Sequence, residues 1–195
     1  IRTLYTTFLE WVLSDPEVGV ITKSKKPEVV ELLPEIHPLI AKAVATGRWL
    51  NLTDVFGRMP SDASRAADMS VGIGITSTVV EAAAAGGRGV HWDLTGMRSH
   101  PFYQWGFKKV VFGELDQLIA ALKRYKSDPA SEPGLGDYSN NMDQVDPFHD
   151  GRTGERVGSY VRWLFESLDS GSDRNTAIRH ANQRFAADWG ADKVT

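Results

Sequence analysis

The sequence predicts an α/β protein with a doubly wound parallel sheet and a C-terminal pair of helices. Three observations support this class. Short apolar runs alternate with segments of helical periodicity through about residue 126, the order that builds a parallel sheet covered on both faces. A stretch rich in Pro, Gly, Asn and Asp follows at residues 127–150. Two further segments with helical periodicity complete the chain.

The first part of the chain supplies two helices and two strands. Residues 4–12 have one apolar helical face, and residues 18–22 read as a short buried strand. Apolar residues then recur at helical spacing over residues 36–44, and Gly47 is the expected end of that helix. The segment 48–52 reads as a second short strand, so helix and strand alternate from the start.

The alternation continues to about residue 126. A loop leads into a short helix and then into the strand "MSVGIGI", in which Val and Ile alternate with residues small enough for close approach of a neighbour. The remaining expected elements are a helix at 78–85, strands at 88–93 and 108–112, and a helix at 115–125. Five strands separated by helices predict a parallel sheet.

The C-terminal third has a different character. Apolar stripes at helical spacing predict helices over residues 157–168 and 177–189, with Ser172 as the N-cap of the second. We therefore expect a doubly wound α/β domain at residues 1–126, a surface loop at 127–150, and a helical extension of the same globule at 151–195.

Composition excludes several classes of function. The 195 residues carry a formal net charge of −3, which argues against a nucleic-acid partner. No cysteine is present, which excludes disulfides and thiolate metal sites and agrees with a cytoplasmic location. No apolar run reaches the length of a transmembrane segment. The sequence begins "IRTLYTTFLEWVL", without an initiator Met or a signal-peptide layout, so we expect a segment of a longer protein.

In a doubly wound sheet, ligands bind beyond the carboxyl ends of the strands. Three of these ends carry suggestive residues. Lys23 follows the first strand, Asp54 and Phe56 follow the second, and the turn "GITST" with Gly74, Thr76, Ser77 and Thr78 follows the third. Lysines in such a position are more often solvated, and a loop aromatic more often plugs a core.

The "GITST" turn admits two interpretations. A helix N-terminus offers unpaired N–H groups and a partial positive charge, which favour a phosphate, and Glu81 one turn later could accept from a sugar hydroxyl. Alternatively, "TVVE" fits a capping box in which Glu81 caps its own helix at Thr78. The full dinucleotide fingerprint is absent, because Ser77 stands in the place of its final glycine.

Other catalytic motifs are absent from the sequence. The five histidines show no zinc-ligand spacing, and the acidic loop at 137–150 does not match a calcium loop, so no metal site is expected. Neither a G-x-S-x-G elbow nor a P-loop is present. The sequence identifies no catalytic residue.

The stretch "AADMSVGIGITSTVVEAAAAGGRGVHWD" resembles the nucleotide-sugar-binding half of GT-B glycosyltransferases and of the related UDP-sugar 2-epimerases, whose fold is Rossmann-like. The resemblance covers residues 18–125, and the tail resembles extensions of surface-polysaccharide biosynthesis proteins. It implies that Ser77 and Thr78 contact a diphosphate and Glu81 a ribose. It also implies that Lys23 contacts the phosphates and that the segment Asp54 to Phe56 contacts the base. Asp93 corresponds to an aspartate that often follows the next strand in this family.

The resemblance implies the donor-binding half of a glycosyltransferase of hexosyltransferase type, acting in polysaccharide biosynthesis. Its expected partners are a nucleotide-diphosphate sugar and an N-terminal acceptor domain of the same polypeptide, with no cofactor. Two features depart from the family: Thr76-Ser77 replaces a glycine pair, and no second basic residue follows Lys23 at the usual distance. The alternatives are a 2-epimerase-like enzyme and a non-catalytic scaffold domain.

Overall fold

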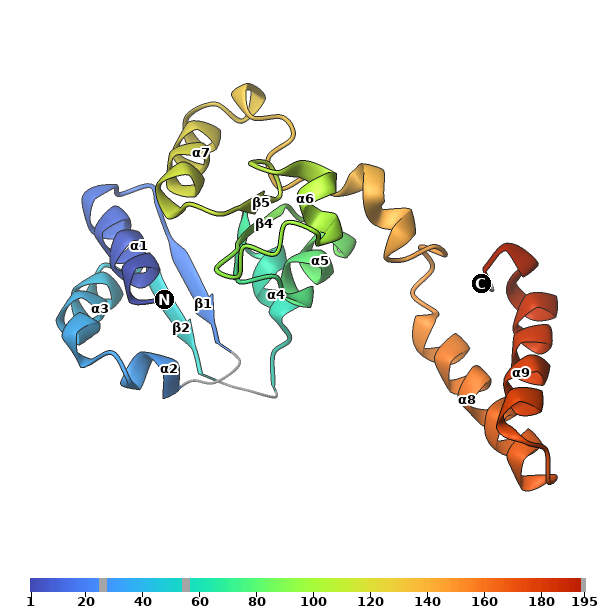
Figure 1. The fold of residues 1–195 in the computed structure, drawn as a ribbon. Coiled ribbons are helices and arrows are strands. Elements are labelled where there is room, and N and C mark those ends of the chain that lie inside the picture. The colour runs from blue at the N-terminus through green and yellow to red at the C-terminus, as the bar shows by residue number, and fades with distance from the viewer. Residues whose placement is uncertain (25–27, 54–56, 194–195) are drawn as a thin grey trace. The chain divides into compact units, whose positions relative to one another are not determined.

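The structure is a computed structural model that describes residues 1–24, 28–53 and 57–193 (Figure 1). It confirms the predicted α/β class with parallel strands. The chain divides into two compact units, Ile1–Asn140 and Asn141–Thr195.

The elements of the first unit follow one another largely as the sequence predicts. Its strands are β1 (Val20–Lys23), β2 (Trp49–Leu52), β3 (Ser70–Ile73), β4 (Gly89–Trp92) and β5 (Val111–Phe112). Its helices are α1 (Arg2–Ser14), α2 (Glu28–Glu31), α3 (His37–Ala45), α4 (Pro60–Arg65), α5 (Ser77–Ala84), α6 (Pro101–Gly106) and α7 (Leu115–Ser127). Short 3₁₀ turns lie at η1 (Pro34–Ile36) and η2 (Pro129–Ser131), and η3 (Ser139–Gln144) spans the boundary between the units.

The strands form two parallel ladders. β1 pairs with β2, and β3, β4 and β5 pair in that order. Within the described residues, no ladder joins β1 to β3, which differs from the one sheet that the alternation predicts. The side chain of Ile73 nevertheless packs against the hydrophobic clusters of both ladders, so side chains rather than backbone hydrogen bonds connect them.

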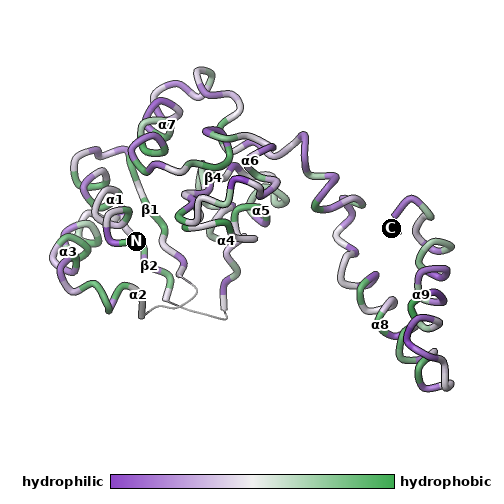
Figure 2. Tube along the Cα trace, in the orientation of Figure 1, coloured by the Kyte–Doolittle hydropathy of each residue, from purple (hydrophilic) through white to green (hydrophobic). Residues whose placement is uncertain are grey.

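Helices cover both faces of the β3–β4 pair, as expected of a doubly wound arrangement. Val90 and Trp92 point into a core that α1 and α7 complete. The alternate residues of β4, Gly89 and His91, face Val79 of α5 and Phe102 of α6 respectively. Because successive side chains of a strand point to opposite faces, this alternation places α1 and α7 on one side and α5 and α6 on the other. Along α1 and α7, hydrophobic and hydrophilic residues alternate accordingly (Figure 2).

The side chain of Val79 occupies the space that is free because Gly72 and Gly89 have no side chains. A Cβ at Gly89 would lie 2.5 Å from Cγ1 of Val79, and a Cβ at Gly72 would lie 2.6 Å from its Cγ2. Val79 is fully buried. Gly72, one of the small residues in the predicted strand pattern, and Gly89 of the neighbouring strand therefore allow α5 to lie directly on the strands.

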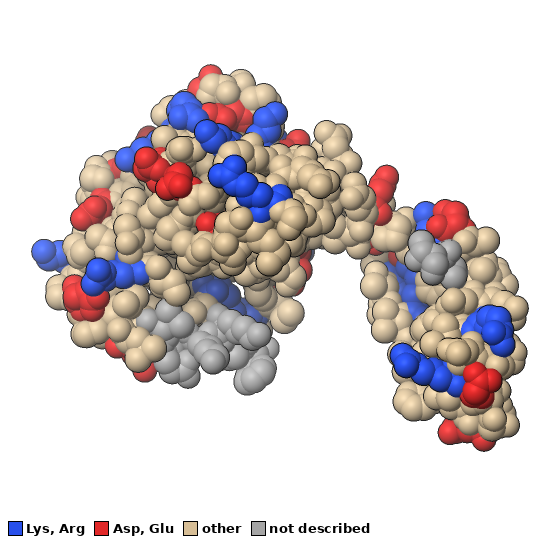
Figure 3. Space-filling view, viewed as in Figure 1, with Lys and Arg blue, Asp and Glu red and all other residues tan. Residues whose placement is uncertain are grey.

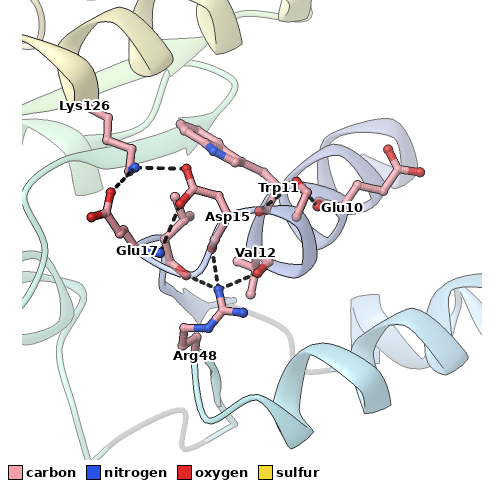
Figure 4. Close-up of polar contacts among 9 residues, drawn as sticks. Glu10, Trp11, Val12, Asp15, Glu17, Arg48 and Lys126 are labelled. Atoms are coloured by element: carbon pink, nitrogen blue, oxygen red, sulfur yellow. Dashed lines mark hydrogen bonds and ion pairs between the residues drawn. The ribbon is translucent and has the colours of Figure 1, made fainter.

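Polar contacts connect the end of α1 to the start of β2 and to α7 (Figure 4). The guanidinium of Arg48, just before β2, donates to the carbonyl oxygens of Val12, Asp15 and Val18. Nζ of Lys126, in α7, lies 2.9 Å from Oδ2 of Asp15 and 2.8 Å from Oε2 of Glu17. These bonds hold the turn between α1 and β1 and give donors to carbonyl groups at the end of α1, which the helix itself leaves without partners.

The segment 127–150, expected to be a surface loop, is partly core. The side chains of Leu135 and Tyr138 are only 1% and 2% exposed. Arg88 holds the segment by donating to the carbonyl oxygens of Pro133 and Leu135. Two apolar residues in a polar stretch give no periodic signal, and for this reason the sequence did not predict that Leu135 and Tyr138 are buried.

The second unit is a helical hairpin of α8 (Thr153–Asp169) and α9 (Arg174–Trp189), followed by η4 (Ala191–Lys193). Asp173, not the expected Ser172, caps α9 by accepting from the amides of Asn175 and Thr176. The buried Arg156 is the centre of this unit. It pairs with Asp150 through two hydrogen bonds, and its guanidinium lies 3.6 Å from the centroid of the Phe148 ring. These contacts fix the residues before α8 to the hairpin, and the Arg156 guanidinium lowers the pKa of Asp150.

Replacing Arg48 by Met should destabilise the first unit by about 2–3 kcal/mol, because three carbonyl groups lose a charged donor while the aliphatic stem is kept. Urea unfolding followed by circular dichroism measures the change. Arg2→Met is the matched control: its ion pair with Glu35 has both side chains well exposed, and its loss should cost less than about 1 kcal/mol. Equal effects of the two variants would contradict the assigned role of Arg48.

Gly89→Ala should destabilise the protein by about 1–3 kcal/mol, because the added methyl overlaps Val79. Gly113→Ala is the control, since a Cβ there has nothing within 4 Å. The loss of stability caused by Val79→Ala should be smaller in the Gly89→Ala variant than in the wild type. The reason is that the methyl group added at position 89 occupies part of the space that Val79 vacates. Strict additivity in this double-mutant cycle would show that Val79 does not occupy the space at Gly89.

Candidate functional site

The candidate site lies where β3 passes into α5, next to the end of β4. The amide of Gly74 donates to the carbonyl oxygen of Trp92 at 2.7 Å, so the ends of the two strands are tied together. Gly74 has φ of +73°, a conformation that favours glycine. The chain therefore turns sharply here and enters α5 beyond the carboxyl end of a parallel strand, where ligands of α/β proteins bind.

The start of α5 is not capped by its N-cap residue. Thr76 is the N-cap, has extended backbone angles and makes no side-chain hydrogen bond to the first turn, which contains no acidic residue. The capping-box interpretation is wrong in register, because the helix begins at Ser77 and Thr78 is already inside it. Ser77 is exposed and Thr78 is half-buried. The first-turn amides and the positive end of the helix dipole therefore keep their attraction for an anion.

Glu81 lies one turn further along α5. Its separation from Ser77 is four residues, which places both side chains on the same face of the helix. Glu81 is partly buried. A carboxylate at this distance from the helix start accepts hydrogen bonds from hydroxyl groups, which suits a sugar more than a phosphate.

The carboxylate of Asp93 organises the loop after β4. It accepts hydrogen bonds from the amide and hydroxyl of Thr95, from the amide of Gly96, and from the Tyr103 hydroxyl at 2.6 Å. Burial acts to raise the pKa of Asp93, but these hydrogen bonds lower it below its ordinary value. Burial and the bond to Asp93 raise the pKa of Tyr103 to about 12. Both carboxylate oxygens thus already have protein donors.

His91 supports the turn from within the protein. Its side chain is fully buried, and Nδ1 lies 3.1 Å from the carbonyl oxygen of Gly74. Because a carbonyl only accepts, Nδ1 carries the proton and Nε2 is left as an acceptor, which has no partner among the described residues. The ring stacks on Phe102 at a centroid distance of 4.9 Å. Burial lowers the pKa of His91 to about 4, so the imidazole is neutral at physiological pH.

The structure brings most of the predicted site residues together. Gly74, Thr76, Ser77, Thr78 and Glu81 lie on one continuous turn and helix, and Asp93 follows the adjacent strand. Lys23 is the last residue of β1, in the other ladder, and is half-buried. Asp54 and Phe56 lie outside the described residues.

Sequence reasoning missed two residues of this region. His91 did not stand out because histidines were considered only for metal-ligand spacing. Its position two residues after Gly89, on the strand face that α5 and α6 cover, was the available signal. Tyr103, in the unexpected helix α6, gave no signal, since its link to Asp93 spans ten residues and depends on the loop between them.

Two surface depressions lie away from the start of α5. One, of about 580 Å³, is lined by residues of α1 and α7, and one of about 530 Å³ lies between α8 and α9. The described part of the chain contains no cluster of three potential metal-binding side chains. Nor does any helix in it have both the length and the apolar character needed to span a membrane.

Comparison of the chain with protein-family models, with curated proteins and with solved structures gives no match. The function therefore has to be inferred from the geometry of the site.

The buried His91 should make stability depend on pH. Its pKa is about 4 in the folded chain and about 6.5 when unfolded, so the unfolded state binds more protons between these values. Stability should therefore fall as the pH drops through this window, by about 2 kcal/mol from pH 7 to pH 5. Urea unfolding at the two pH values measures the difference. His91→Gln should remove most of it and the exposed His180→Gln should not; an unchanged difference in His91→Gln would contradict the assignment.

Proposed function

We propose that the chain is the donor-binding half of a GT-B-like glycosyltransferase and holds a nucleotide-diphosphate sugar at the start of α5. The observation that carries the proposal is the first turn of α5, which is uncapped and free of acidic residues, and begins directly after the left-handed Gly74. Such a helix end stabilises phosphate oxygens through its amides and its dipole.

The side chains around this helix end suit the other parts of the ligand. The hydroxyl groups of Ser77 and Thr78 would donate to the diphosphate, and Glu81 on the same helix face would accept from the ribose. Lys23 is the basic residue proposed for the phosphates, and the segment Asp54 to Phe56 for the base. Asp93 would act indirectly, by holding the loop 93–96 beside the turn.

The chemistry of such an enzyme depends on orientation of two substrates and on stabilisation of the departing diphosphate. The start of α5 would supply the second of these. The acceptor would be held by an N-terminal domain of the same polypeptide, in a cytoplasmic enzyme of polysaccharide biosynthesis. The chain by itself is then expected to bind a nucleotide weakly and to transfer no sugar.

A scaffold function without catalysis is the second candidate. It is favoured by the hydrogen bonds that already occupy both carboxylate oxygens of Asp93. The two functions differ in whether a nucleotide binds.

Calorimetric titration with UDP, GDP, CMP and CDP-linked sugars tests the proposal. One of them should bind saturably, and Ser77→Ala and Glu81→Ala should each weaken it about tenfold, the effect of losing one hydrogen bond to a charged group. Ser127→Ala and Glu10→Ala are matched controls at exposed helical positions and should bind as the wild type does. Folded protein that binds none of these nucleotides would refute the transferase function and favour the scaffold.

A further inference from the structure

One face of α8 is apolar along almost its whole length. Val157, Val161, Phe165 and Leu168 recur at helical spacing, and their side chains are 57%, 42%, 60% and 43% exposed. We call these four residues the α8 stripe. Gly154 and Gly158 lie on the same face of the helix, and a Cβ at either position would meet open space. A solvent-facing helix surface normally carries polar residues, so this face is built to be covered.

The hairpin buries its opposite face and leaves the stripe uncovered. Arg156 and Ser167 of α8 are buried on the side toward α9, where Tyr160 bonds to Asn182 and Trp163 packs beside Trp189. Two acidic residues of α8 are paired within the second unit, Glu155 with Arg152 and Glu166 with Arg184. Two helices bury only one seam between them, and a further helical layer is needed to cover the outer face.

We propose that the α8 stripe is a homodimer interface, in which two copies of α8 pack antiparallel across a two-fold axis near Val161. Large and small residues are segregated along this face of α8. Gly154 and Gly158 lie in its N-terminal half, and Phe165 and Leu168 lie in its C-terminal half. Antiparallel pairing sets the large half of each copy against the small half of the other. The face is therefore complementary to itself, as a two-fold interface requires.

The apolar area fits a weak dimer. With about 150–200 Å² for a fully exposed large apolar residue, the exposed fractions of the four side chains leave roughly 350 Å² on each copy. Two copies bring together about 700 Å², and because a non-obligate interface is a little over half apolar, the whole interface would bury about 1,200 Å². That value is the lower limit for a specific protein interface.

The charge of the second unit disfavours a membrane as the occupant. Residues 141–195 contain seven Lys and Arg against nine Asp and Glu, a net charge of −2. Side chains of both signs lie on the face of this unit that Figure 3 shows. An amphipathic helix that binds anionic lipid has a basic polar face instead.

Sedimentation equilibrium of the full chain tests the proposal. A reversible, concentration-dependent species of twice the 21.5 kDa monomer mass is expected. Phe165→Glu should raise the dissociation constant at least tenfold, whereas Val44→Glu, at a similarly exposed position on α3, should leave it unchanged. Circular dichroism confirms that each variant is folded. A wild type that stays monomeric would overturn the proposal, whether the stripe is then found covered by the first unit, by another protein or by vesicles.

The absence of cysteine from the sequence permits a test of orientation. Under oxidation, Val161→Cys should form a disulfide-linked dimer, because the two copies of residue 161 meet at the axis. Val157→Cys alone should not, because antiparallel packing separates its two copies by about 12 Å along the helices. A mixture of Val157→Cys and Phe165→Cys should cross-link to each other. Homodimer formation by all three variants would show parallel packing and overturn the proposed geometry.

Discussion

The position of α5 depends on one close contact, the insertion of Val79 between Gly72 and Gly89. A helix normally packs about 10 Å from a sheet because side chains on both surfaces keep them apart. Here both strands lack a side chain under the helix, and Val79 reaches the backbone. The same absence at Gly72 leaves space for the Thr76 hydroxyl and His91 Nδ1, which would lie 3.2 and 3.3 Å from a Cβ at that position. The glycines therefore set both the depth of α5 and the shape of the turn before it.

The turn before α5 is held from two sides. The amide of Gly74 is bonded to Trp92 and its carbonyl to His91, so both of its backbone groups point to β4. Buried backbone groups need partners, and a residue satisfied on both sides has little freedom to move. If this turn holds the phosphates as proposed, it loses little entropy when the ligand binds. The buried histidine thus stabilises the turn that precedes α5.

The sequence was sufficient where local periodicity decides structure. The strands, the main helices and the small residues of β3 were all predicted to within a few positions, because alternation and the 3.6-residue repeat depend only on neighbours along the chain. The larger error occurs where a distant contact decides, and two smaller errors displace a helix cap or a helix start by one residue. Leu135 and Tyr138 are buried by elements far away in sequence, and Asp173 rather than Ser172 caps α9. The start of α5 differed by one residue, which was enough to invalidate the capping box at Thr78.

The uncapped start of α5 and the exposed α8 stripe differ in how much stability they cost the folded chain. Ser77 at the start of α5 is exposed, so water reaches this helix end, and a free end of this kind is stable without a ligand. The α8 stripe has no such substitute, because water does not solvate Phe165 or Val157 favourably. Each exposed apolar side chain forfeits about 1 kcal/mol or more that burial would provide. The uncovered apolar surface therefore indicates a protein partner more strongly than the open helix end does. The open helix end, which is stable without an occupant, is better suited to a ligand that binds reversibly.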